Sequence, residues 1–341
     1  MPRVSVVIPT FNMAEFLPQA IESVLNQAWP EVETIVVDDG STDGTESVVR
    51  PYLRKVGYYR QENQGVWATR NQGIRMAQGQ LIRFLDADDL LAPGSLVKQV
   101  DAFQRDPHVA LVWGRAYVMD REGSLYGTRV AAPPKGAEGV VCSPVAFRWL
   151  LRGNSICNST VMVRRSALNR LAPLDRGAVR GEDWEMWLRL AAHYDLAYIP
   201  SPLAYYRTHA NSLTSRTTVE MFRDSHLQTV RSLFAGPDNP YRTLEGLAQA
   251  YVQRSVALSA AWCRQPGLFT RHFLKALARR PDIALEWYSW YCLYEAAKAV
   301  TPMRVLQRLR QLKRHLGSVR HHRAGPLAEV ERDFPLPPRM S

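Results

Sequence analysis

The segment FLDADD, residues 84–89, places three carboxylates directly after an apolar run, at Asp86, Asp88 and Asp89. Carboxylates held this close repel one another, and a divalent cation that bridges them to a diphosphate relieves the repulsion. A hard cation such as Mg²⁺ or Mn²⁺ would also neutralise the charge that develops on a departing nucleotide diphosphate. The alternative is a solvated turn that caps a helix beginning near Pro93. The motif alone leaves both interpretations open.

A second acidic segment, VVDDGSTDGT at residues 36–45, has the residues of a tight turn followed by a helix. Gly40 and Gly44 permit sharp turning, and the hydroxyl and carboxylate side chains between them can cap the next helix. This turn chemistry does not explain the adjacent carboxylates Asp38 and Asp39. A carboxylate at the end of a strand can accept hydrogen bonds from a nucleotide base or ribose.

The elements that must position these carboxylates alternate between β-branched runs and helical patterns. We expect strands at residues 4–8, 34–37, 56–59, 81–85, 109–113 and 160–163, and helices at 16–25 and 65–77. This alternation predicts βαβ units and an α/β fold with a parallel sheet in its first hundred residues. Ligands of such sheets bind at the carboxyl ends of the strands, where residues 10–12, 38–43 and 86–89 lie. The sequence therefore predicts one polar crevice at these strand ends.

The motifs together resemble the family 2 glycosyltransferases of GT-A fold. The matching segments occur in the family's order as VSVVIPTFN, VVDDGSTDGT, ENQGVWATRNQG, FLDADD, RGEDWEMWLRLA and YYRTHANSLT. The resemblance covers about residues 3–214. It implies a Rossmann-like mixed sheet with a nucleotide-binding half at residues 1–105 and an acceptor half at 106–214.

The resemblance also implies how the nucleotide of the donor is bound. Pro9, Thr10 and Phe11 would line the base pocket, with the Phe11 ring packed on the base. Asp39 would hydrogen-bond the base, and Arg70 would face the diphosphate.

The cation and the rest of the donor would lie against Asp86 and Asp88 of the FLDADD segment. By resemblance, Asp86 would approach the ribose and the cation, and Asp88 would ligate Mn²⁺ or Mg²⁺ directly. His209 would approach the diphosphate or the cation from the far side. Taken alone, a single histidine is more often structural.

Asp183 is the residue to which the resemblance assigns the chemical step. The acceptor hydroxyl must lose its proton as it attacks the anomeric carbon, and a nearby carboxylate acts as general base. The family implies a single displacement with inversion of configuration. Asp183 also lies near the start of a predicted helix, whose Trp184, Trp187, Leu188 and Ala191 could face the core, so a role in stabilising the helix N-terminus is the alternative.

Two further features of the sequence indicate which kind of transferase to expect. Processive relatives carry a Gln-x-x-Arg-Trp motif, whereas Arg148–Trp149 has Val145 in place of the glutamine. No apolar run reaches the roughly 20 residues needed to span a bilayer. We therefore expect a single-addition enzyme that uses a nucleotide sugar, with UDP-sugar as the favoured donor and a glycan or lipid-linked acceptor.

A basic helical region is expected at residues 215–333, followed by a loose tail at 334–341. Residues 215–341 hold 20 of the 43 Lys and Arg but 10 of the 32 Asp and Glu, so they carry most of the net charge of +11. Trp287, Trp290, Tyr291 and Tyr294 share one helical face, and a basic amphipathic pattern follows. Residues 283–323 could bind an anionic membrane surface or pack on the catalytic domain.

Other classes fit less well. The N-terminal segment MPRVSVVIPTFN has only a short apolar run and lacks the cleavage site of a secretory signal, and the four cysteines form no CxxC pair, so we expect a cytoplasmic location. A nucleic-acid-binding protein lacks a recognised reading motif, and a sugar nucleotidyltransferase lacks its Gly-rich basic loop. The retained rival is a non-catalytic nucleotide-sugar or glycan-binding protein of the same fold.

Overall fold

The computed structural model describes residues 1–134, 139–171, 182–210, 212, 215–235 and 239–301. The chain divides into two units. The N-terminal unit comprises residues 1–150 and 154–212, and the C-terminal unit comprises residues 151–153 and those from 213 onward. The predicted boundary at residue 214 stays a prediction.

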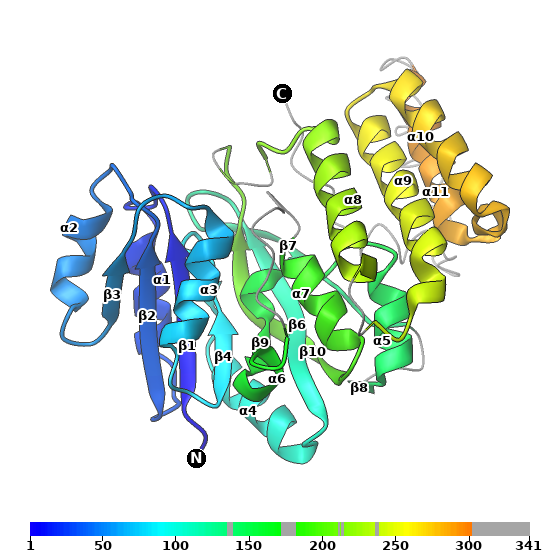
Figure 1. Cartoon of the computed structure of the whole chain (residues 1–341). Coiled ribbons are helices and arrows are strands. Elements are labelled where there is room, and N and C mark those ends of the chain that lie inside the picture. The colour runs from blue at the N-terminus through cyan, green and yellow to red at the C-terminus, as the bar shows by residue number, and fades with distance from the viewer. Residues whose placement is uncertain (135–138, 172–181, 211, 213–214, 236–238, 302–341) are drawn as a thin grey trace, which may run out of the picture. The chain divides into compact units, whose positions relative to one another are not determined.

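The N-terminal unit is built on one mixed sheet (Figure 1). Its strands follow the order β3 (Gly57–Arg60), β2 (Val32–Asp38), β1 (Val4–Thr10), β4 (Leu81–Phe84), β9 (Met162–Arg164), β6 (Val109–Met119), β10 (Asp195–Arg207) and β5 (Leu90–Leu91). Two further strands, β7 (Leu125–Arg129) and β8 (Val140–Val141), pair with β6 and β10. Strands β1 to β4 run parallel to their neighbours in this group, whereas β9 is antiparallel to both β4 and β6.

Helices cover both faces of this sheet. The helices of the unit are α1 (Leu17–Leu25), α2 (Thr45–Val49), α3 (Val66–Met76), α4 (Ser95–Arg105), α5 (Ser143–Leu150), α6 (Arg165–Leu168) and α7 (Glu182–Ala191). Val4, Val6 and Ile8 of β1 share a buried core with α1 and α4. Successive strand residues point to opposite faces, so the intervening Val7 faces the other side of the sheet, where it packs against Gly73 of α3. A Cβ added at Gly73 would lie 2.2 Å from the Val7 Cγ1 atom.

The architecture confirms the predicted α/β, GT-A-like fold. The expected strands and helices of the first hundred residues are present, and their carboxyl ends fall where the polar segments begin. The sequence did not predict β10, a strand of 13 residues that pairs in parallel with β6. Pro200 and Pro202 lie within it, and its register with β6 shifts between Ile199 and Ala204. Proline cannot donate to a strand ladder, so the irregularity accommodates both prolines and obscured the strand in the sequence.

The described part of the C-terminal unit is helical, as predicted. It contains α8 (Val219–Ala235), α9 (Glu245–Trp262), α10 (Pro266–Arg279) and α11 (Trp287–Val300). Arg254 of α9 is fully buried, donates to Glu286 at 2.6 Å and lies over the rings of Tyr251 and Tyr288. No helix among the described residues is both long and apolar enough to cross a membrane. The predicted basic segment after residue 301 and the tail at 334–341 lie outside the described residues.

Candidate donor and catalytic site

The polar segments of the N-terminal unit lie side by side because their strands are parallel neighbours. Thr10 at the end of β1 pairs with Asp38 at the end of β2, and Val7 pairs with Phe84 at the end of β4. The turns that follow these strands therefore emerge at the same edge of the sheet, as the sequence predicted.

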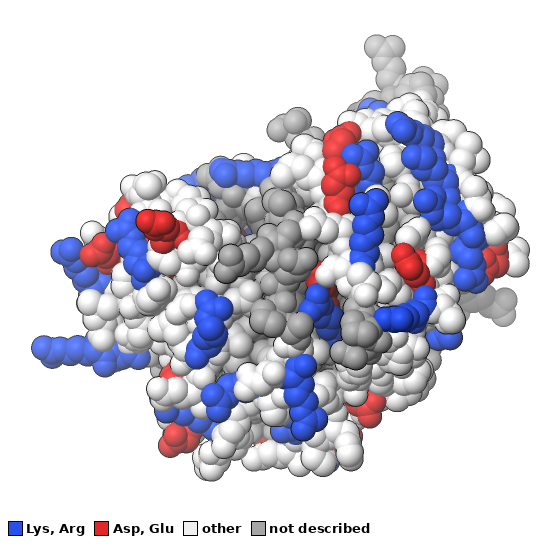
Figure 2. Space-filling model, viewed as in Figure 1, with Lys and Arg blue, Asp and Glu red and all other residues white. Residues whose placement is uncertain are grey.

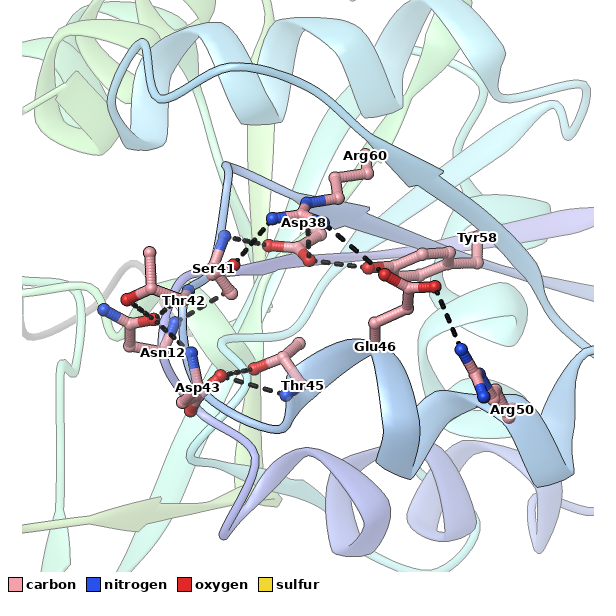
Figure 3. Close-up of polar contacts among 10 residues, drawn as sticks. All are labelled: Asn12, Asp38, Ser41, Thr42, Asp43, Thr45, Glu46, Arg50, Tyr58 and Arg60. Atoms are coloured by element: carbon pink, nitrogen blue, oxygen red, sulfur yellow. Dashed lines mark hydrogen bonds and ion pairs between the residues drawn. The ribbon is translucent and has the colours of Figure 1, made fainter.

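Asp38 organises the turn after β2 (Figure 3). Its buried carboxylate accepts hydrogen bonds from the Ser41 backbone N–H at 2.9 Å and the Tyr58 hydroxyl at 2.6 Å. Burial and the Asp38 carboxylate raise the pKa of Tyr58, so the phenol remains a donor at neutral pH. The Arg60 guanidinium donates to the Ser41 carbonyl oxygen at 2.8 Å. Asp38 is thus part of the scaffold.

The turn after β1 is fastened to the turn after β2. Asn12 has a positive φ of 53°, and its side-chain oxygen accepts from the Thr42 backbone N–H at 2.8 Å. Asp43 accepts from the backbone N–H group of Thr45 at 3.0 Å (Figure 3). It also accepts from the backbone N–H group of Ala14 at 3.0 Å. These contacts hold the two loops in one arrangement beside Phe11, whose side chain is 43% exposed.

Asp39 faces a different loop from its neighbour Asp38. Its carboxylate is buried and accepts from the Gln61 side chain at 2.8 Å and from the backbone N–H groups of Gln64 and Gly65 at 2.9 and 2.8 Å. A carboxylate can accept about four hydrogen bonds, so one position remains. The role of Asp39 towards a base, like those of Pro9, Thr10 and Phe11, stays a prediction.

The Asp86 carboxylate forms an ion pair with Arg70 within the site. Its Oδ1 atom accepts from the Arg70 guanidinium at 2.9 Å and from the Asn158 side-chain amide at 2.8 Å. Burial raises the pKa of Asp86, and the charges of Asp88 and Asp183 act in the same direction, whereas Arg70 opposes them. The structure therefore brings Arg70, Asp86, Asp88 and Asp183 into one electrostatic cluster.

Asp88 and His209 are in direct contact. The His209 Nε2 atom lies 3.0 Å from the Asp88 Oδ2 atom, and the His209 ring packs on Phe16 with centroids 5.0 Å apart. Among the residues that the structure describes, no group of three or more His, Cys, Asp and Glu side chains is placed to hold a metal. One carboxylate oxygen and one imidazole nitrogen nevertheless suit a divalent cation that takes water and substrate phosphates as its remaining ligands.

Arg207 holds the turn that carries Asp88. Its buried guanidinium donates to the carbonyl oxygens of Asp88 and Arg121 at 2.8 and 2.7 Å and to the Gln19 side-chain oxygen at 2.8 Å. The Arg207 backbone N–H donates to Asp89 at 2.8 Å. The sequence motif contained Arg207, but its role became apparent only from these contacts.

One carboxylate oxygen of Asp183 is hydrogen-bonded to described residues and the other is not. Its Oδ1 atom accepts from the Asn154 side-chain amide at 2.9 Å and from the Trp184 backbone N–H at 2.8 Å, whereas Oδ2 makes no hydrogen bond with any described residue. The rest of α7 is fixed because Trp184, Trp187, Leu188 and Ala191 are fully buried, as predicted. No motif in the sequence singles out Asn154 or Asn158, whose partners lie 29 and 72 residues away.

Comparisons with known proteins identify the family of this chain and structures that share its fold. The sequence model of the family described as Glycosyl transferase family 2 matches residues 5–171. The putative teichuronic acid biosynthesis glycosyltransferase TuaG of Bacillus subtilis (strain 168) is 30% identical over 220 residues, which are 63% of this chain and 82% of that protein. The chain covers 32 to 66% of the length of the first curated relatives that it matches.

Two solved structures share the fold. S. aureus TarS 1–349 in complex with UDP-GlcNAc has a TM-score of 0.62 at 17% identity, over 87% of this chain and 89% of that chain. The mannosyltransferase PcManGT from Pyrobaculum calidifontis, in complex with GDP-Man and Mn²⁺, has a TM-score of 0.53 at 18% identity, over 88% and 81% of the two chains. At these sequence identities the two structures show the shared fold alone. The chain belongs to glycosyltransferase family 2.

Proposed function

We propose that this chain transfers a single sugar from a nucleotide-diphosphate sugar, with UDP-sugar as the donor class, to a hydroxyl of a glycan or lipid-linked acceptor. The transfer inverts the anomeric configuration and serves the synthesis of a cell-surface polysaccharide or glycolipid. The single observation that carries this proposal is the open Oδ2 atom of Asp183 beside the Arg70, Asp86 and Asp88 cluster. A binding protein of the same fold has no need for such a carboxylate.

The donor nucleotide would occupy the edge where β1 and β2 end. The half-exposed Phe11 ring offers a stacking surface for the base, with Pro9 and Thr10 behind it and Asp39 as a hydrogen-bond acceptor. The UDP-GlcNAc in the TarS complex supports a uridine nucleotide as the donor class. Arg70 would reach the diphosphate from the bottom of the site, where it already balances Asp86.

Asp88 and His209 would hold Mn²⁺ or Mg²⁺ together with the diphosphate oxygens, and Asp86 would complete the acidic side. The cation in the mannosyltransferase complex supports this assignment. When bound, such a cation stabilises the negative charge of the departing diphosphate. His209 is held against Phe16, so its nitrogen faces Asp88.

The reaction would proceed as one displacement. The acceptor hydroxyl gives its proton to Asp183 Oδ2 as its oxygen bonds to the anomeric carbon. The bond from that carbon to the diphosphate breaks on the opposite face, and the electron pair remains on the leaving oxygen next to Arg70. The two donors on Asp183 Oδ1 keep the other oxygen directed away from the helix backbone.

The test is nucleotide release from a panel of nucleotide sugars with Mn²⁺ present, alongside calorimetric binding of the same donors. Asp183→Asn is nearly isosteric and should lower kcat by about 10² to 10⁴, with donor affinity retained. Asp88→Ala should weaken binding in the presence of the cation. Asp101→Asn on α4 is the matched control, because Asp101 makes no hydrogen bond with a described residue. Binding of a donor without turnover by the wild type would instead establish the rival, a non-catalytic binding protein.

The C-terminal unit would bring the enzyme to the inner face of the cytoplasmic membrane. On α11, Trp290 is 63% and Tyr294 51% exposed, and the exposed face continues through Leu293 to Val300. Tyr291 is half-buried, and the Trp287 side chain lies outside the described residues. Figure 2 shows Lys and Arg side chains gathered over this unit. Exposed aromatic residues and basic residues are the two features of interfacial membrane binding.

Vesicle flotation tests the membrane proposal. The full chain should float with vesicles that contain phosphatidylglycerol but not with phosphatidylcholine vesicles, and it should not be retained on DNA. Trp290→Ala should reduce flotation. Tyr126→Ala is the control, since Tyr126 is an aromatic residue of the N-terminal unit that is 60% exposed. Equal flotation of both variants would contradict a role for α11.

A further inference from the structure

One short segment contacts both carboxylates that the proposed reaction needs. The side-chain amide of Asn154 donates to Asp183 at 2.9 Å, and that of Asn158 donates to Asp86 at 2.8 Å. The hydroxyl oxygen of Ser159 accepts from the Asp86 backbone N–H at 3.1 Å. Residues 154–159 thus contact both Asp183 on the proposed acceptor side and Asp86 on the proposed donor side.

The segment is anchored to the sheet. Ile156, Cys157 and Ser159 are buried, and residues 158–160 form a 3₁₀ turn that leads into β9 between β4 and β6. The Thr160 hydroxyl donates to the Cys157 carbonyl oxygen at 2.8 Å, and the Gln99 side chain of α4 donates to the Thr160 carbonyl oxygen at 2.9 Å. A segment fixed in this way can hold the two carboxylates that its asparagines contact in defined positions.

Asn154 also has a fixed orientation. Its Nδ2 atom faces Asp183, while its Oδ1 atom is buried without a hydrogen-bond partner among the described residues. Reversing the amide would place an oxygen against the carboxylate, which is repulsive.

We propose that residues 154–159 form a positioning segment that sets the distance and orientation of the base Asp183 relative to Asp86 of the donor site. The proposal rests on the proposed transferase function. Asn154 and Asn158 are positioning residues, because each acts through the carboxylate that it holds. Asn154 governs proton removal from the acceptor, whereas Asn158 governs the donor side.

The charged groups around Asp183 define what a substitution at Asn154 would change. Asp86 from the turn after β4 and Arg129 from β7 are close enough for their charges to interact with that of Asp183, and Glu185 is a further carboxylate on α7. Asn154→Asp would add a carboxyl group in hydrogen-bond contact with Asp183. Two carboxyl groups that share a site cannot both ionise readily, so one of them titrates at a higher pH.

The experiment compares the pH dependence of kcat and the affinity for UDP in wild type, Asn154→Asp, Asn154→Ala and Asn158→Asp. Asn154→Asp should move the acid limb of the kcat profile upward by about one pH unit or more, with UDP affinity unchanged. Asn158→Asp should weaken UDP binding at least about tenfold, since it adds a negative charge beside the diphosphate, and should leave the acid limb in place. Asn169→Asp is the control, because Asn169 is exposed at the end of α6 and makes no side-chain hydrogen bond with a described residue.

The outcomes are distinguishable. If Asn154→Asp does not fold, Asn154→Ala should still lower kcat with the donor KM unchanged. The inference is overturned if the Asn154 variants keep the wild-type profile and kcat, as Asn169→Asp should. If the wild type releases nucleotide from no donor, the proposed function fails instead, and UDP binding by Asn158→Asp still tests the donor-side half of the inference.

Discussion

Replacing Arg207 by methionine should destabilise the N-terminal unit more than any other single arginine substitution around the site. The guanidinium is 2% exposed and makes three hydrogen bonds of 2.7 to 2.8 Å, two of them to the carbonyl oxygens of Asp88 and Arg121 and one to Gln19. Its cation also lies 4.9 Å from the centre of the Phe16 ring. Methionine would fill the space of the aliphatic stem but would leave these acceptors unpaired.

The magnitude follows from the number of acceptors left behind. A hydrogen bond to a charged group contributes about 1.5–3 kcal/mol. Removal of the buried charge relieves part of its desolvation penalty, so the expected net loss is about 3–5 kcal/mol. Arg121→Met is the matched control, since the Arg121 side chain is half-exposed and pairs with an equally exposed Glu15. Exposed ion pairs contribute little to stability.

The assay must report the N-terminal unit alone, because a chain of two units need not unfold in one step. Native-state hydrogen exchange in urea, followed on peptides from β1 and β2, meets this requirement. Arg207→Met should lower the free energy of opening of these peptides by the stated amount, and Arg121→Met should leave it nearly unchanged. Equal effects of the two substitutions would show that Arg207 does not hold the site together.

Three further predictions test other parts of the account. Gly73→Ala should destabilise the N-terminal unit by about 1–3 kcal/mol in the same exchange assay, because the new Cβ would overlap Val7, whereas Gly44→Ala, with 3.9 Å to its nearest neighbour, should change it by less than about 0.5 kcal/mol. Hydrogen bonds from Thr45 and Ala14 outweigh burial and hold the pKa of Asp43 below its ordinary value of 3.8. The stability that ionised Asp43 contributes is therefore present above about pH 4 and lost as the pH falls through the lowered pKa, so the difference in unfolding midpoint between wild type and Asp43→Asn should shrink in acid. Chelation of divalent cations should abolish donor turnover but leave the unfolding midpoint of the donor-free chain unchanged, because hydrogen bonds between protein groups join the turns after β1 and β2.

The sequence predicted β1, β2 and β4 because each contains a short apolar run that is also buried in the folded sheet. The strands β1, β2 and β4 are largely buried, are rich in β-branched and other apolar residues, and end at a polar turn. Each of them is readable from a few residues. The prediction of β10 failed because Pro200 and Pro202 break its periodicity, and because its pairing with β6 is a long-range contact.

Within the candidate site, the sequence singled out carboxylates that stand in motifs, but not the side chains that contact them. Asp86, Asp88 and Asp183 stand in recognisable motifs. Asn154 and Asn158 lie in a stretch that resembles an ordinary polar turn, and nothing local indicates that their amides serve two carboxylates distant in sequence. Supporting contacts of this kind become visible only when the chain is folded.

The most direct test of the central claim is a crystal structure of the chain with Mn²⁺ and a non-hydrolysable analogue of the donor that it turns over. We expect the diphosphate between Arg70 and the Asp88–His209 pair, with Asp183 Oδ2 facing the anomeric carbon from the opposite side. The gap should hold one acceptor hydroxyl, about 2.6–3.2 Å from the carboxylate and about 3–3.5 Å from the carbon. A sugar bound where no hydroxyl could bridge it to Asp183, or a diphosphate remote from Asp88, would contradict the account.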